Sequence, residues 1–166
     1  MTHDEPFVYR DIMTKAVCGR GKRYARTTYR LRPEHLPTTV LGCWVINHRF
    51  GARLAGKDAY ISGSYDINLW FAYDANSKTD VAKQTVQYEL RVPMEDLDEH
   101  FTGRDGEVHA ACIQPPTCVE THLEEDGQVA VTVELEMRAE IFGETMLRVP
   151  TVPMEEGKKD ELPKDL

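Results

Sequence analysis

Apolar and polar residues alternate with a period of two in several separate stretches of the chain. These stretches are residues 24–31, 64–73, 85–92 and 129–137, and a further strand is expected before them over about residues 11–18. In the last of them, valine, leucine and methionine alternate with threonine and glutamate, and the pattern continues towards Ile141. Because successive side chains of a strand point to opposite faces, this alternation predicts β-strands with one face against a core.

Short polar segments, most of them containing glycine, separate these stretches and predict turns. The predicted connections are residues 19–21, 74–78, 103–106 and 126–127. Gly19-Arg20-Gly21 can supply the positive φ angles of a tight reversal, so it is expected to end a first strand and begin a second. Asp126-Gly127 is expected to close a hairpin between 119–124 and the strand that begins at Val129.

The segments together predict an all-β fold: a single antiparallel β-sandwich or barrel-like domain with little helix. Seven or eight strands are joined by short turns, and only residues 95–101 and 33–36 could form a helical turn. Two packed sheets are the preferred arrangement. The predicted organisation is an N-terminal arm over 1–8, one β domain over 9–149, and a short mobile tail over 150–166.

Residues 40–48 form a strand that is apolar on both faces. Trp44, Ile46 and His48 are expected on one face, whereas Leu41 and Cys43 are expected on the other. Such a strand is expected to be covered on both sides, either inside the monomer or by another subunit.

A second candidate interface lies in the stretch from 64 to 73, where Asp66, Asn68 and Trp70 share one face. An aromatic platform beside hydrogen-bonding side chains is typical of sugar-binding strands. The same residues also suit a protein interface, because tryptophan offers a large contact area with a polar edge. Both interpretations stay open.

The distribution of charge along the chain bears on which partners it could bind. The chain carries −8 overall, but residues 1–60 hold 11 Lys/Arg against 5 Asp/Glu, whereas residues 61–166 hold 9 against 23. The acidic total disfavours nucleic-acid binding. The two regions could attract separate copies of the chain, or they could neutralise each other within one monomer.

No apolar run is long enough to cross a bilayer and the N-terminus lacks a signal-peptide pattern, so synthesis in a cytoplasm without membrane insertion is expected.

The chain has none of the common phosphate, zinc-protease or hydrolase motifs, so no enzyme activity, catalytic residue, cofactor or metal is predicted. One loose group of possible ligands, His109, Cys112, Cys118 and His122, would need irregular backbone to surround a metal. All four cysteines, Cys18, Cys43, Cys112 and Cys118, are candidates for disulfides between chains. Cys18 and Cys118 are expected to be the more exposed thiols.

Six stretches of the sequence carry a resemblance to a known family. They are residues 9–17, 41–48, 63–73, 76–79, 114–118 and 139–145. In these stretches, in this order, the chain resembles the CotE family of outer spore coat morphogenetic proteins.

The resemblance implies a non-enzymatic protein made in the mother-cell cytoplasm during sporulation and then located in the outer spore coat. It implies a homo-oligomer, such as a small ring or trimer, which assembles into a larger lattice around the forespore. The implied partners are other spore coat proteins, including the coat-basement ATPase. The chain departs from the family pattern in its tail, where residues 151–166 hold only 5 Asp/Glu and 3 Lys instead of a long acidic extension.

Overall fold

The structure is a computed structural model that describes residues 7–103 and 105–152. Seven strands make up most of these residues and none of them is helical. The strands are β1 (Val8–Leu31), β2 (Pro37–Ala55), β3 (Asp58–Tyr73), β4 (Lys78–Val92), β5 (Asp96–Leu97), β6 (Glu107–Leu123) and β7 (Val129–Thr151). The helical turns expected over 95–101 and 33–36 are therefore wrong, since the first contains β5 and the second is a bend.

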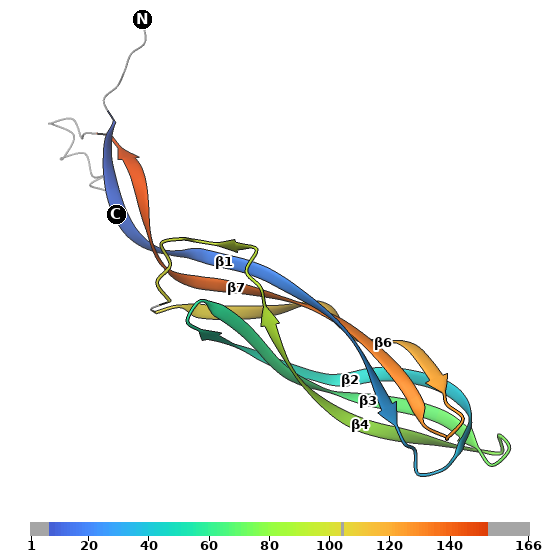
Figure 1. Cartoon of the computed structure of the whole chain (residues 1–166). Helices are drawn as coiled ribbons and strands as arrows, with labels where there is room; N and C mark the ends of the chain where they lie inside the picture. Colours follow the sequence, from blue (N-terminus) through green and yellow to red (C-terminus); the bar gives the residue numbers. More distant parts are fainter. Residues whose placement is uncertain (1–6, 104, 153–166) are drawn as a thin grey trace, which may run out of the picture.

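The strands form two antiparallel sheets that pack face to face, as the alternation predicted (Figure 1). The four-stranded sheet has the order β5-β1-β7-β6, and the three-stranded sheet has the order β2-β3-β4. β2 lies over β6 along one side of the sandwich, but the two strands are not joined in a common ladder. The arrangement is thus a sandwich and not a closed barrel.

The core lies between the two sheets and is built from alternate residues of the central strands. In β7 the buried residues are Val129, Val131, Val133, Leu135, Met137, Ala139 and Ile141, and in β3 they include Ile61, Tyr65, Ile67, Leu69 and Phe71. Tyr65 in β3 also joins the sheets directly, because its hydroxyl donates a hydrogen bond of 2.9 Å to the hydroxyl of Tyr29 in β1. Each fully buried aliphatic side chain stabilises the fold by about 1.5–3 kcal/mol, so these two strands anchor the domain.

Two of the predicted turns are confirmed. Asp126-Gly127 lies in the tight connection between β6 and β7, where Gly127 has a φ of 85°. Residues 74–78 connect β3 to β4, and Asp74, Ala75 and Asn76 all adopt positive φ there. The predicted connection over 103–106 leads into β6, although residue 104 lies outside the described residues.

The reversal predicted at Gly19-Arg20-Gly21 is wrong, because β1 runs without interruption from Val8 to Leu31. Neither glycine has a positive φ. Instead, the chain between β4 and β5 crosses β1 so closely that a β-carbon on Gly21 would lie 2.0 Å from the carbonyl oxygen of Pro93. The glycines therefore serve a close approach of distant backbone and not a turn.

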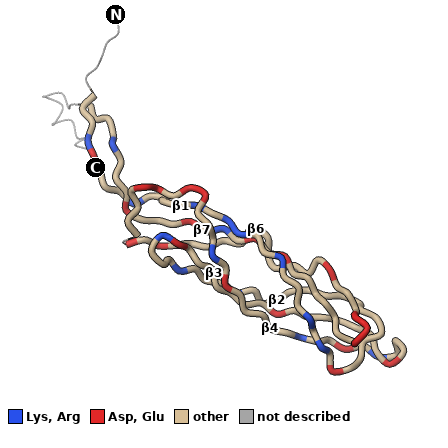
Figure 2. The backbone as a smooth tube through the Cα atoms, in the orientation of Figure 1, with Lys and Arg blue, Asp and Glu red and all other residues tan. Residues whose placement is uncertain are grey.

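The basic and acidic regions of the chain meet inside one monomer. Arg26 of β1 lies 2.6 Å from Glu134 of β7, and Arg20 contacts Glu140 of the same neighbouring strand. Figure 2 shows Lys and Arg positions interspersed with Asp and Glu positions along the body. Of the two arrangements that the charge pattern allowed, neutralisation within the monomer is thus realised for these side chains.

Most of the predicted N-terminal arm (1–8) and C-terminal tail (150–166) lies outside the described residues. Val8, Pro150 and Thr151 are described, and they belong to strands β1 and β7. The described part of the chain contains no helix that could cross a membrane.

Candidate assembly surfaces

The first and last strands extend together beyond the rest of the sandwich (Figure 1). We call this two-stranded extension, residues 8–17 and 143–151, the terminal ribbon. Its antiparallel ladder begins with Val8 opposite Thr151. β5 and β6 pair only with the parts of β1 and β7 that lie inside the body. Both long edges of the ribbon therefore carry backbone groups without a strand partner among the described residues.

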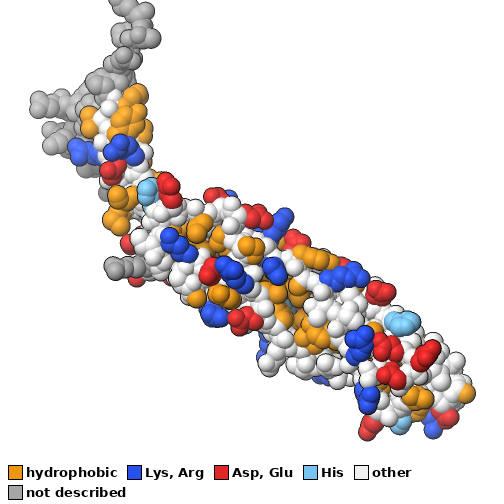
Figure 3. Space-filling view, in the orientation of Figure 1, with side chains coloured by type: hydrophobic (Ala, Val, Ile, Leu, Met, Phe, Trp, Pro, Cys, Tyr) orange, Lys and Arg blue, Asp and Glu red, His pale blue; other side chains and the backbone are white. Residues whose placement is uncertain are grey.

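Apolar side chains project from both faces of the terminal ribbon. Residues directly opposite each other share a face, so Ile12 and Leu147 lie on one face and Met13 and Met146 on the other. All four are exposed, and 71% of Met13 is accessible. Apolar side chains are visible at this end of the molecule in Figure 3. An isolated two-stranded ribbon is only marginally stable in water, which makes this segment a strong candidate for contact with another chain.

The base of the ribbon is held by the connection that contains β5. The backbone amide of Asp98 donates a hydrogen bond of 2.6 Å to the carbonyl of Cys18. The carboxylate of Asp98 accepts a hydrogen bond from the hydroxyl of Thr145, and this bond lowers the pKa of Asp98. Phe101, which is buried, covers Gly143. The base is thus fixed to the body, whereas the outer part of the ribbon is left uncovered.

A second exposed apolar surface lies on the outer face of the three-stranded sheet. We call it the tryptophan face, and it comprises Trp44, Ile46, Asn68, Trp70 and Val81. Trp44 and Trp70 are 42% and 41% exposed, and both indole rings approach the position of a β-carbon on Gly42, at 3.4 and 3.9 Å. The absence of a side chain at residue 42 lets the two rings converge.

Asn68 lies between the two tryptophans, because it pairs with Trp44 across the β2–β3 ladder and precedes Trp70 by two positions. Its Oδ1 atom is buried without a hydrogen-bond partner among the described residues. A buried carbonyl without a partner is costly, so a donor from another molecule would be favoured at this point.

Asp66 lies next to the tryptophan face and is held by three neighbours. The side-chain amide of Asn47 donates to Oδ2 over 2.9 Å, and the hydroxyl of Thr85 donates to Oδ1 over 2.6 Å. Lys83 lies 3.5 Å from the same carboxylate. These hydrogen bonds, first that from Asn47 and then that from Thr85, lower the pKa of Asp66, so it presents a fixed negative charge.

His48 does not lie on the face expected for it. The β2–β3 register shifts between Ile46 and Arg49, and Asn47 adopts a φ of 58°. This bulge adds a residue and turns His48 inward, where its Nε2 atom lies 2.6 Å from the hydroxyl of Tyr88. Burial lowers the pKa of His48. His48 is therefore a structural residue of the sheet and not part of the tryptophan face.

The strand from 40 to 48 was expected to be covered on both faces. Within the monomer only one face is covered, since Cys43 and Val45 pack against the core while Trp44 and Ile46 are exposed. The prediction that the monomer itself covers both faces is thus wrong for the face that carries Trp44 and Ile46. Coverage of that face by another subunit stays a prediction.

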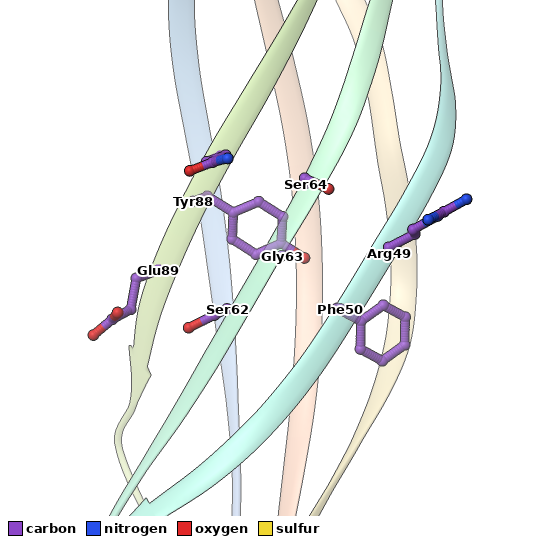
Figure 4. A pocket seen from close by; sticks show the side chains of 8 residues that line it. Arg49, Phe50, Ser62, Gly63, Ser64, Tyr88 and Glu89 are labelled. Atoms are coloured by element: carbon purple, nitrogen blue, oxygen red, sulfur yellow. The ribbon is translucent and has the colours of Figure 1, made fainter.

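A shallow hollow of about 660 Å³ lies over Gly63 in the same sheet (Figure 4). The ring of Tyr88 occupies the space beside Gly63, where a β-carbon would lie 2.5 Å from it. The charged side chains of Arg49 and Glu89 come from β2 and β4 and point away from each other in Figure 4. The hollow lacks the converging ionisable groups that acid-base catalysis requires.

Of the two cysteines expected to be exposed, Cys118 is partly exposed and Cys18 is buried. Cys18 is only 3% exposed, and its thiol approaches the carbonyls of Ala16 and Gly143 inside the body. The expectation of an exposed thiol at Cys18 is therefore wrong, because the crossing segment covers this part of β1. Cys112 is partly buried against the core.

Cys43 and Cys118 lie together, which the sequence did not predict. Their side chains line the same small surface hollow, although they come from β2 and β6. The interaction of the two thiols raises the pKa of Cys43 and lowers that of Cys118 to about 7.

The loose group of possible metal ligands is not brought together. His109 contacts Glu107 and the ring of Phe142 at the start of β6, whereas Cys118 contacts Cys43. Among residues 7–103 and 105–152, no three His, Cys, Asp or Glu side chains are grouped so that they could hold a metal ion.

The ribbon residues were missed as candidates by the sequence analysis. The available signal was that apolar residues occur at both odd and even positions near each end of the β domain, as at Ile12 and Met13 and again at Met146 and Leu147. A strand with this pattern has no water-facing side. What the sequence could not show is that the body covers only the base of the ribbon, around Gly143 and Thr145, and leaves its outer apolar side chains exposed.

The family model for outer spore coat protein E (CotE) matches residues 8–165. The chain belongs to the CotE family. Membership of the CotE family confirms the resemblance and indicates a structural protein of the spore coat that interacts with other coat proteins. No curated protein and no solved structure matched the chain in these comparisons.

Proposed function

We propose that the protein is a self-assembling morphogenetic component of the spore coat, which multiplies around the forespore and directs assembly of the outer coat. The terminal ribbon carries this proposal. It offers unpaired strand edges and apolar side chains on both faces, and a second copy of the chain supplies the matching edges. Synthesis in the mother-cell cytoplasm and recruitment by the coat-basement ATPase belong to the same proposal and rest on family membership.

The ribbon can form the first contact between copies. Burying Ile12, Met13, Met146 and Leu147 contributes about 1–2 kcal/mol for each side chain, scaled by how much of it is now exposed. Edge-to-edge hydrogen bonds fix the register of the two ribbons. A contact between the same edge of two copies closes into a dimer, whereas a contact between the β1 edge of one copy and the β7 edge of the next closes into a ring or trimer.

A lattice needs a second contact surface, because a closed oligomer has used its first one. The tryptophan face is the proposed second surface. Tryptophan is among the residue types most often found at the energetic centre of interfaces. The Oδ1 atom of Asn68 has no hydrogen-bond partner among the described residues, so it could accept a hydrogen bond from another copy. The same features suit a sugar, so carbohydrate binding is the competing function.

Light scattering and electron microscopy of the purified full chain over a range of concentrations test the proposal. Met13→Lys and Ile12→Lys are expected to weaken assembly at least tenfold, since a lysine cannot be buried without a partner. Ile113→Lys is the matched control, because Ile113 is equally exposed but lies on β6 outside the ribbon. Assembly that is unchanged in both ribbon variants would overturn the role of the ribbon.

Trp44→Ala and Trp70→Ala separate the second contact from the competing function. If the tryptophan face joins oligomers, both variants form small closed oligomers that no longer grow into sheets. If instead wild type binds oligosaccharides saturably, Trp70→Ala loses that binding, and assembly is unaffected, the face is a carbohydrate site.

A further inference from the structure

The open side of the sandwich, where β2 lies over β6, has no backbone ladder to join the sheets. We call this side the seam. Cys43 of β2 stands opposite the buried Leu69, and Cys118 of β6 stands opposite the buried Val133. Since opposite residues share a face, both cysteines point inward from the edge strands of the two sheets and meet across the seam.

Contact and access are both present at this pair. Both side chains pack against the core from the edge of their sheet, and each thiol is close enough to shift the pKa of the other. Both line a surface hollow of about 200 Å³ together with Val119, Glu120 and Thr121. A small oxidant can therefore reach the pair from solvent, in contrast to the buried Cys18.

We propose that Cys43 and Cys118 form a disulfide within one chain, which clamps the two sheets of the sandwich together along the seam. The bond forms in each subunit whether or not the protein assembles. It also removes these two cysteines from the set that could link neighbouring chains. The seam is thus a redox-controlled modification site.

The reaction balances with a low-molecular-weight disulfide as oxidant. The Cys118 thiolate attacks one sulfur of that disulfide and releases one small thiolate, which leaves a mixed disulfide on Cys118. Cys43 then loses its proton to solvent and its sulfur attacks the Cys118 sulfur, releasing the second small thiolate. Two protein thiols are oxidised to one disulfide, and the small disulfide is reduced to two thiols. Cys118 is suited to the first step because its pKa is lowered to about 7.

The disulfide would constrain the unfolded chain strongly, because it closes a loop of about 75 residues. For a chain of this size the expected rise in Tm is roughly 10 °C. Loss of the bond on reduction would return the Tm to that of the thiol form.

The test is oxidation of the purified full chain with increasing ratios of oxidised to reduced glutathione. We expect a single species lighter by two hydrogen atoms, a disulfide-linked peptide pair that contains Cys43 and Cys118, and a raised Tm. Cys43→Ser and Cys118→Ser are each expected to abolish the Tm rise. Cys112→Ser is the matched control and is expected to keep it, since Cys112 is also partly buried but does not line the hollow that holds Cys43 and Cys118.

A mixture of isotopically light and heavy chains distinguishes linkage within a chain from linkage between chains. Peptide pairs that are only light-light or heavy-heavy support the proposal. Mixed pairs joining Cys43 and Cys118 would overturn it, and so would two free thiols after full oxidation. Since these readouts do not require assembly, failure here is distinct from failure of the self-assembly proposal, which light scattering measures.

Discussion

Replacing Gly21 by alanine tests why β1 carries glycines at its middle. A β-carbon at residue 21 would lie 2.0 Å from the carbonyl oxygen of Pro93, whereas ordinary contacts begin near 3.4 Å. The crossing segment must therefore move by about 1.4 Å. That segment is tied to β1 by the amide of Glu95, which donates a hydrogen bond of 2.8 Å to the carbonyl of Arg20.

The expected change in the free energy of unfolding of Gly21→Ala combines three effects. Forcing extra atoms into a tight contact costs about 1–3 kcal/mol, and weakening the neighbouring hydrogen bond adds about 0.5–1.5 kcal/mol. The smaller conformational freedom of unfolded alanine offsets about 0.4–1 kcal/mol. The expected net loss is about 2–3 kcal/mol in the free energy of unfolding, or a fall in Tm of roughly 4–12 °C.

Urea and thermal unfolding followed by circular dichroism measure this loss, with all variants at one protein concentration. Gly51→Ala is the matched control, because Gly51 also lies in a strand but a β-carbon there meets nothing within 4 Å. It is expected to be neutral or slightly stabilising. If Gly21→Ala is as stable as Gly51→Ala, the close crossing of β1 by the Pro93 segment is refuted.

Two further predictions concern groups inside the sandwich. Tyr65→Phe removes the hydrogen bond to Tyr29 that joins the sheets, so it should lower the free energy of unfolding by about 1 kcal/mol in urea titrations, whereas Tyr60→Phe should change little. His48 has a lowered pKa in the folded protein, so below pH of about 6.5 the unfolded chain takes up a proton more readily and stability falls until the folded pKa is passed. His48→Gln should flatten this loss of stability as the pH falls below about 6.5, and an unchanged slope would contradict the burial of His48.

The alternation of apolar and polar residues predicted the central strands because their side chains alternate regularly between the core and the other face of the sheet. In β7 every second residue from Val129 to Ile141 faces the core, and the ladder with β1 has a single register shift over its whole length. The turn at Asp126-Gly127 was also predictable from the sequence, since the positive φ of Gly127 is required by the short hairpin itself. On the candidate surface, Trp44, Asp66, Asn68 and Trp70 follow from the same period of two.

The errors arose where a distant segment or a local bulge decides the conformation. Gly19 and Gly21 resemble a turn in sequence, but their role depends on the segment 93–97, more than seventy residues away. His48 was assigned to the wrong face because one bulged residue inverts all that follows. The contact of Cys43 with Cys118 depends on which edge strands of two sheets meet, and no spacing in one strand reports that.

The proposed disulfide and the proposed contact between copies lie in separate parts of the fold, the seam and the terminal ribbon. Cys118 pairs with Val133 on β7, ten residues before the ribbon begins at Gly143, which corresponds to about 33 Å along the strand. A disulfide at the seam would therefore fix the sandwich without touching the ribbon edges that are proposed to join copies. Oxidation should raise the Tm of each subunit but leave the concentration at which copies dissociate unchanged. A coat built in this way would gain durability after assembly while the ribbon contact stays unchanged, because the bond that stabilises each subunit is distant from the ribbon edges.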